Sequence, residues 1–151
     1  MPAITQAEVQ EFADIWYKKL DVHAPLEDFR PMIASEGFRM IVPEATLVGW
    51  NKFSDWYIGG NDLPGVINIF FDEVHELKSV VTTPTQNETA TVKVVVKWQA
   101  SAWNAPDPKS KRIVLDAYQT WEMIRSSQSG RLCILTYTVD EMKLYEGSAS
   151  L

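Results

Sequence analysis

The chain has 151 residues and a formal net charge of −6, and 46% of its residues are hydrophobic. This length predicts one domain over residues 1–151, and the apolar fraction excludes wholesale disorder. The acidic balance argues against nucleic-acid binding, which needs clustered Lys and Arg. We find no apolar run long enough for a membrane span and no secretory signal. The single cysteine, Cys133, excludes an internal disulfide, so we expect a cytoplasmic protein.

The first element is predicted to be an amphipathic helix over residues 6–20. Thr5 and Glu8 form a T-x-x-E capping box, which satisfies free N–H groups at a helix start. Apolar side chains then recur at helical spacing on one face: Val9, Phe12, Ala13, Trp16 and Leu20. This face is expected to pack against the core.

Shorter elements follow as far as Gly60. Pro25 begins a second, short helix, because proline suits the first turn of a helix. Residues 38–42 are predicted to form a short strand, and residues 51–58 are predicted to form a third helix. Gly59 and Gly60 end that helix, since glycine accepts the left-handed backbone of a helix C-cap.

The second half of the chain predicts four long strands. They are rich in Val, Ile, Thr and aromatic residues, are separated by short polar connections, and cover residues 66–82, 90–103, 112–125 and 132–145. Such spacing favours an antiparallel meander. Three helices followed by four strands indicate an α+β fold with helices on one face of a sheet. The lack of βαβ alternation excludes a doubly wound nucleotide-binding fold.

Side chains alternate between the two faces of a strand, which sorts the candidate interior residues. In residues 112–125, Gln119 and Trp121 share a face with Ile113, Leu115, Ala117 and Met123. In residues 90–103, Trp98 shares a face with Val92, Val94 and Val96. In residues 66–82, His75 shares a face with Glu73 and with apolar residues, namely Ile67, Ile69, Phe71, Leu77 and Val81. A histidine, a glutamine and two tryptophans therefore converge on an apolar interior.

With these residues in view, the chain resembles the nuclear transport factor 2-like superfamily, and it is most similar to the SnoaL-like polyketide cyclase branch. The segments that carry the resemblance are IWYKKLDVHAPLEDF, GFRMIVPEATLVGWNKFSDWY, FFDEVHELKSV and TWEMIRSSQSGRLCILTYTV. The resemblance implies a cone-like, curved antiparallel or mixed sheet wrapped around a long N-terminal helix, with three helices in all, a deep pocket and a homodimer. The fold hosts isomerases, dehydratases, cyclases, epoxide hydrolases and noncatalytic binding modules.

Comparison with the catalytic residues of ketosteroid isomerases argues against steroid isomerisation by this chain. The oxyanion-binding tyrosine of ketosteroid isomerases aligns with Trp16, and their catalytic aspartate aligns with Val42. Their second acid aligns near Gln119. Because valine cannot transfer a proton, steroid isomerisation by that mechanism is not expected.

His75 is the candidate general base, because imidazole exchanges protons near neutral pH. The alternative is a core histidine satisfied by a protein partner. Glu73, on the same face, is either its orienting partner or a strand-end carboxylate in water. Gln119 could orient a ligand oxygen or bond to a protein partner, and His23 is interpreted as a loop residue near a helix C-terminus.

The chain has six Trp, five Tyr and six Phe, more tryptophan than a core of this size needs. The candidate ligand-binding residues are therefore Trp16, Trp56, Tyr57, Trp98, Gln119, Trp121 and Tyr137. Ordinary core packing is the alternative for each ring. No paired metal-ligand spacing, phosphate loop or G-x-S-x-G elbow occurs, so we expect neither a metal nor a cofactor.

Two functions remain open. The first is a pocket protein for a small hydrophobic or cyclic molecule, with cofactor-free acid–base catalysis as an isomerase, dehydratase or cyclase. The second is a noncatalytic dimeric module that binds a ligand or a protein. A homodimer is expected in either case, because the outer face mixes apolar and polar residues (Val114, Tyr118 and Ile124).

Overall fold

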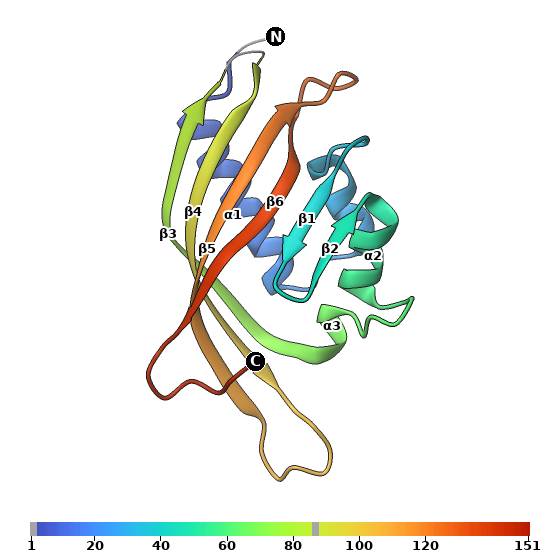
Figure 1. Ribbon diagram of the computed structural model, residues 1–151, viewed down its shortest axis with the longest axis vertical. Coiled ribbons are helices and arrows are strands. Elements are labelled where there is room, and N and C mark those ends of the chain that lie inside the picture. Colours follow the sequence, from blue (N-terminus) through green and yellow to red (C-terminus); the bar gives the residue numbers. More distant parts are fainter. Residues whose placement is uncertain (1–2, 86–87) are drawn as a thin grey trace.

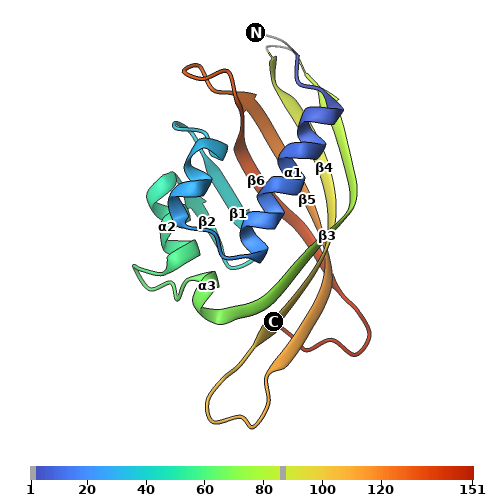
Figure 2. The same cartoon turned by 180° about the vertical axis from the view of Figure 1, so that it is seen from behind.

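The long N-terminal helix α1 (Gln6–Asp21) lies across one face of the sheet in the computed structural model, which describes residues 3–85 and 88–151 (Figures 1 and 2). Its start follows the capping pattern: Thr5 is the N-cap, and its hydroxyl accepts a hydrogen bond from the Glu8 backbone N–H at 3.2 Å. The buried face consists of Val9, Phe12, Ala13, Trp16, Tyr17 and Leu20. The helix ends one residue later than the predicted range, at Asp21, which is important for the site.

Six strands form one mixed sheet in the order β2-β1-β6-β5-β4-β3. The four long strands are antiparallel: β3 (Phe70–Pro84), β4 (Ala90–Ala102), β5 (Lys111–Arg125) and β6 (Leu132–Leu144). β1 (Arg39–Val42) pairs in parallel with β6 and antiparallel with β2 (Ala45–Val48). The α+β fold with a curved mixed sheet around α1 is therefore confirmed, and β2 is an addition to the predicted elements.

Three short helical segments complete the fold beside β1 and β2. They are the 3₁₀ helix η1 (Leu26–Met32) and the α-helices α2 (Trp50–Ile58) and α3 (Val66–Ile69). The prediction of a strand from residue 66 is wrong for these first four residues, which form α3. Gly65, at φ +86°, turns the chain against Gly59, whose backbone nitrogen would lie 2.5 Å from a Cβ atom at Gly65. No helix of the described residues is long and apolar enough to cross a membrane.

Two irregularities in β3 change the predicted facing of its side chains. The register with β4 shifts between Phe71 and Val74 and again between Leu77 and Ser79. Phe71 and Val81, both expected to face the interior, are 41% and 54% exposed. A bulge adds one residue to one strand and thereby reverses the facing beyond it. His75 and Leu77 lie between the two shifts and keep the predicted facing.

Candidate functional site

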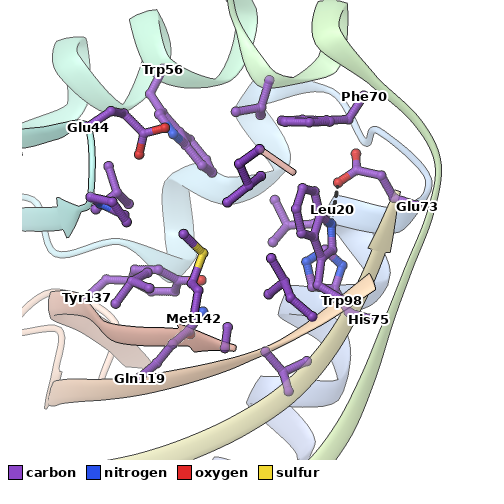
Figure 3. A pocket seen from close by; sticks show the side chains of 18 of the residues that line it. Leu20, Glu44, Trp56, Phe70, Glu73, His75, Trp98, Gln119, Tyr137 and Met142 are labelled. Atoms are coloured by element: carbon purple, nitrogen blue, oxygen red, sulfur yellow. Dashed lines mark hydrogen bonds between the residues drawn. The ribbon is translucent and has the colours of Figure 1, made fainter. Parts of the chain in front are cut away.

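A cavity of about 420 Å³ opens between the concave face of the sheet, the C-terminal end of α1 and the α2–α3 segment (Figure 3). Its volume lies in the range of ~300–1,000 Å³ that is typical of small-molecule pockets. Most of the wall is apolar, and Leu20, Val96 and Met142 contribute to it. Polar groups lie at three places, one of which is Glu44 beside Trp56. Figure 3 shows Glu73 and His75 on one side and Gln119 and Tyr137 on the other.

The cavity wall contains most of the residues proposed from the sequence. Those that line it are His75, Trp56, Tyr57, Trp98, Gln119 and Tyr137. Trp16 and Trp121, also expected in the wall, are not among the residues that line it. Both indoles are 0% exposed, with ring centroids 6.5 Å apart between α1 and the sheet. The body of α1 covers this part of the sheet, so these two rings form core.

His75 is held by a carboxylate at the end of α1. Its Nδ1 lies 2.6 Å from Asp21 Oδ1, and its backbone N–H donates to Asp21 Oδ2 at 3.1 Å. An Nδ1–H bonded to this carboxylate leaves Nε2 of the neutral ring as a proton acceptor. Nε2 has no hydrogen-bond partner among the described residues. The ring stacks on Tyr17 at 4.9 Å between centroids, which fixes its plane.

Glu73 does not orient His75, so that interpretation is corrected. Its Oε2 lies 2.5 Å from His23 Nε2, and its Oε1 accepts a hydrogen bond from Trp98 Nε1 at 3.0 Å. His23 follows the end of α1, as expected, but its imidazole turns back to β3. Two histidine–carboxylate pairs therefore stand side by side, where the sequence suggested only one candidate base.

A second polar group lies around the Gln119 side chain. Gln119 Oε1 accepts hydrogen bonds from the Tyr17 hydroxyl at 2.7 Å and from Trp121 Nε1 at 3.1 Å. Because the carbonyl oxygen accepts both bonds, the amide NH₂ is the donor towards Tyr137, and it has a second N–H hydrogen to offer. Burial raises the pKa of Tyr137 to about 12, although hydrogen bonds with Gln119 and Tyr17 act in the opposite direction. The Tyr137 phenol is therefore protonated near neutral pH and able to donate.

Tyr57 and the acidic residues complete the electrostatics of the cavity. The Tyr57 hydroxyl donates to the Ala24 carbonyl at 2.6 Å, which fixes its ring in the wall. Burial raises the pKa of Tyr57 to about 12, and the nearby negative charge of Glu73 adds to this effect. The residues that line the cavity include Glu44 and Glu73 but no Lys or Arg. No group of three or more His, Cys, Asp or Glu in the described part of the chain is placed to hold a metal ion.

Asp21, Tyr17 and the role of His23 are not predicted by the sequence patterns. One signal was available, because the tripeptides Asp21-Val-His23 and Glu73-Val-His75 repeat the same acid–Val–His pattern. Each places an acid two residues before a histidine. In the structure each acid bonds to the histidine of the other tripeptide. This pairing depends on where the end of α1 meets β3.

No protein-family model matches the sequence, and no curated protein matches it either. Among solved structures, a proposed aromatic ring hydroxylase from Novosphingobium aromaticivorans has a TM-score of 0.73 at 11% identity, with 92% of each chain covered. The hexachlorocyclohexane dehydrochlorinase LinA type 2 has a TM-score of 0.70 at 13% identity, covering 97% of this chain and 92% of that one.

A nuclear transport factor 2-like superfamily protein from Salmonella enterica has a TM-score of 0.64 at 14% identity, covering 95% of this chain and 96% of that one. At these identities the similarity is one of fold. It agrees with the curved sheet and the long helix described above, and it confirms the fold that the resemblance in the sequence implied. The chain has the fold of the nuclear transport factor 2-like superfamily.

Proposed function

We propose that this protein is a cofactor-free enzyme that removes a proton from a neutral hydrophobic or cyclic small molecule, as an isomerase, dehydratase or cyclase does. The observation that carries the proposal is the His75–Asp21 pair, with 2.6 Å between Nδ1 and Oδ1, at the wall of an apolar cavity. A histidine oriented by a carboxylate is a recurrent arrangement in general-base catalysis.

The geometry supports one sequence of proton and charge movements. His75 Nε2 takes a proton from a substrate carbon beside a carbonyl group, and Asp21 stabilises the imidazolium that forms. Negative charge then develops on the carbonyl oxygen. The Gln119 amide NH₂ and the Tyr137 hydroxyl supply hydrogen bonds to that oxygen from the other side of the cavity.

The charges in the wall favour a neutral substrate. A carboxylate or phosphate ligand is normally met by Arg or Lys, and the lining residues include neither, whereas Glu44 and Glu73 would repel it. The similar structure that is named a dehydrochlorinase is in keeping with this chemistry, because elimination also removes a proton from carbon.

The test is exchange of an acidic C–H group with solvent. Purified protein in D₂O, incubated with the bicyclic ketone β-tetralone, should speed the incorporation of deuterium beside the carbonyl, measured by mass spectrometry. His75→Gln should lower that rate by about 10²–10⁴-fold, the usual contribution of a general base. Asp21→Asn should lower it as well, because the amide has one acceptor oxygen for the two His75 N–H groups and no negative charge to stabilise the imidazolium.

The matched control is Glu76→Gln, which changes an exposed carboxylate next to His75 on the opposite face of β3. This variant should exchange the ketone at the wild-type rate. Equal exchange by the wild-type protein and His75→Gln would overturn the proposal. A small molecule retained in native mass spectrometry, without any exchange activity, would instead support the noncatalytic binding module.

A further inference from the structure

We propose that Glu73 and His23 form a second proton-transfer unit, which protonates a leaving hydroxyl group while His75 removes the carbon-bound proton. The inference rests on the proposed function and makes it more specific. The reaction becomes dehydration of a neutral, cyclic β-hydroxy carbonyl compound, with two separate acid–base groups on one side of the cavity.

Each histidine–carboxylate pair joins the end of α1 to β3, because the acid of each segment bonds to the histidine of the other. At the end of α1, Asp21 and His23 are two residues apart, and on β3 Glu73 and His75 are two residues apart. Asp21 bonds to His75 at 2.6 Å and Glu73 bonds to His23 at 2.5 Å. The chain contains only two histidines, and both are in these pairs. A single base needs only one such pair, so the second requires its own explanation.

The Glu73–His23 pair connects the cavity with solvent. The Glu73 side chain is 8% exposed and lines the cavity, whereas the His23 side chain is 27% exposed and is not part of the wall. Trp98 Nε1 holds the other carboxylate oxygen at 3.0 Å, so the carboxyl group has one fixed orientation. A proton can therefore enter at His23 and be delivered from Glu73.

The backbone next to both partners adopts a conformation that L-amino acids seldom use. His23 has φ +51°, and Asp72, which precedes Glu73 at the register shift of β3, has φ +50°. Such positions cost about 1–3 kcal/mol each and concentrate at functional sites. Bulges also redirect side chains next to active sites. Among the described residues the same conformation occurs at Asn61, Asp62 and Glu88, so it sets the direction of the chain at His23 and Asp72, and the case for the pair rests on its contacts.

The elimination moves two protons, one through each histidine–carboxylate pair. His75 Nε2 accepts the proton from the α-carbon, and the electron pair of that C–H bond forms the carbon–carbon double bond. The proton held between His23 Nε2 and Glu73 Oε2 is transferred through the Glu73 carboxyl group to the β-hydroxyl oxygen, which leaves Glu73 as a carboxylate and His23 as a neutral imidazole. The C–O bond breaks and water leaves. His23 then takes a proton from solvent through its exposed edge, and His75 releases one, which restores both pairs.

The experiment separates the two proton transfers with one probe, a β-hydroxyindanone. This neutral bicyclic ketone has an acidic C–H beside the carbonyl and a hydroxyl group on the next carbon. Deuterium incorporation in D₂O reports the step at His75, and indenone formation reports the complete elimination. Glu73→Gln keeps an acceptor for Trp98 but cannot donate a carboxyl proton. His23→Asn suits the positive φ and removes the imidazole.

Both variants should lower indenone formation by about 10²–10⁴-fold, while deuterium incorporation falls by less than about tenfold. His75→Gln should lose both activities, and Glu76→Gln should lose neither. Thermal unfolding monitored by circular dichroism establishes that each variant is folded.

Each other outcome overturns a specific statement. Wild-type rates of elimination in Glu73→Gln and His23→Asn would refute the second proton-transfer unit and leave the His75–Asp21 base standing. A parallel loss of exchange and elimination in folded variants would assign Glu73 a structural role and also refute it. Wild-type protein that neither exchanges nor converts the probe would refute the proposed function, and the second unit with it.

Discussion

Replacing Gln119 with leucine tests the buried polar group at the far side of the cavity. Gln119 Oε1 accepts hydrogen bonds from the Tyr17 hydroxyl at 2.7 Å and from Trp121 Nε1 at 3.1 Å. Tyr17 is 2% exposed and Trp121 is 0% exposed, so water cannot replace the lost acceptor. Leucine fills nearly the same space, so the variant removes hydrogen bonds without opening a large cavity.

The expected loss in the free energy of unfolding follows from the two donors. A buried donor without an acceptor costs about 1–3 kcal/mol. The Tyr17 hydroxyl can rotate towards the neighbouring Tyr137 side chain and recover part of its cost. The Trp121 N–H has a fixed direction and no other hydrogen-bond acceptor among the described residues. We therefore expect Gln119→Leu to lower the free energy of unfolding by about 2–4 kcal/mol.

Urea unfolding followed by tryptophan fluorescence measures this loss, and the control is Gln99→Leu. Gln99 lies on β4, and its side chain makes no hydrogen bond in the described structure, so that change should stay within about 0.5 kcal/mol. Tyr17→Phe should be less harmful in the Gln119→Leu background than alone, because it removes a donor that has lost its acceptor. A loss below about 0.5 kcal/mol for Gln119→Leu would refute the reasoning.

Three further outcomes follow from other parts of the molecule. Burial raises the folded-state pKa of Tyr137 to about 12 from an ordinary 10.0. Its stabilisation is therefore present below pH 10 and lost as the pH rises towards 12, and wild type should lose about 3 kcal/mol more than Tyr137→Phe in urea unfolding across that window. Gly65→Ala should lower the melting temperature far more than Gly130→Ala, because both glycines have positive φ but only Gly65 meets backbone atoms, at 2.5 Å. Light scattering at micromolar concentration should give a dimer that uses the outer face of β5 around Val114 and Ile124, and a monomer would contradict it.

Elements that depend on local signals were predictable from the sequence. The start of α1 follows from the capping box and the apolar spacing, both of which lie within a few residues of each other. Residues 66–69 were assigned wrongly because a short apolar run does not distinguish helix from strand. Here the turn at Gly65 decides, since its positive φ places the next residues in α3 before β3 begins.

The site residues were only partly predictable, because their partners lie far away in the sequence. Alternation along β3 placed His75 in the interior, but its partner Asp21 is 54 residues away in the sequence. No local pattern specifies that the last residue of α1 reaches the middle of β3. The bulges of β3 follow the same rule, because they depend on pairing with β4 and they reverse the facing of Phe71 and Val81.

The length of α1 explains why some tryptophans form core and others form the cavity wall. The start of the helix meets the far end of β3, where Gln6 bonds to the Val80 carbonyl, and its last residue, Asp21, bonds to His75. Trp121 lies under this covered part of the sheet and packs on Trp16.

Trp98, paired with His75 across β3 and β4, lies where α1 ends. Beyond that point α1 no longer runs along the concave face (Figure 2). The cavity lies there. Trp98 and Trp121 both point to the concave face of the sheet, but only Trp121 is covered by α1. Their roles therefore differ because of the point at which the helix ends. The same terminus supplies both Asp21 and His23, so the depth of the cavity and its acid–base groups are set together by the point at which α1 stops.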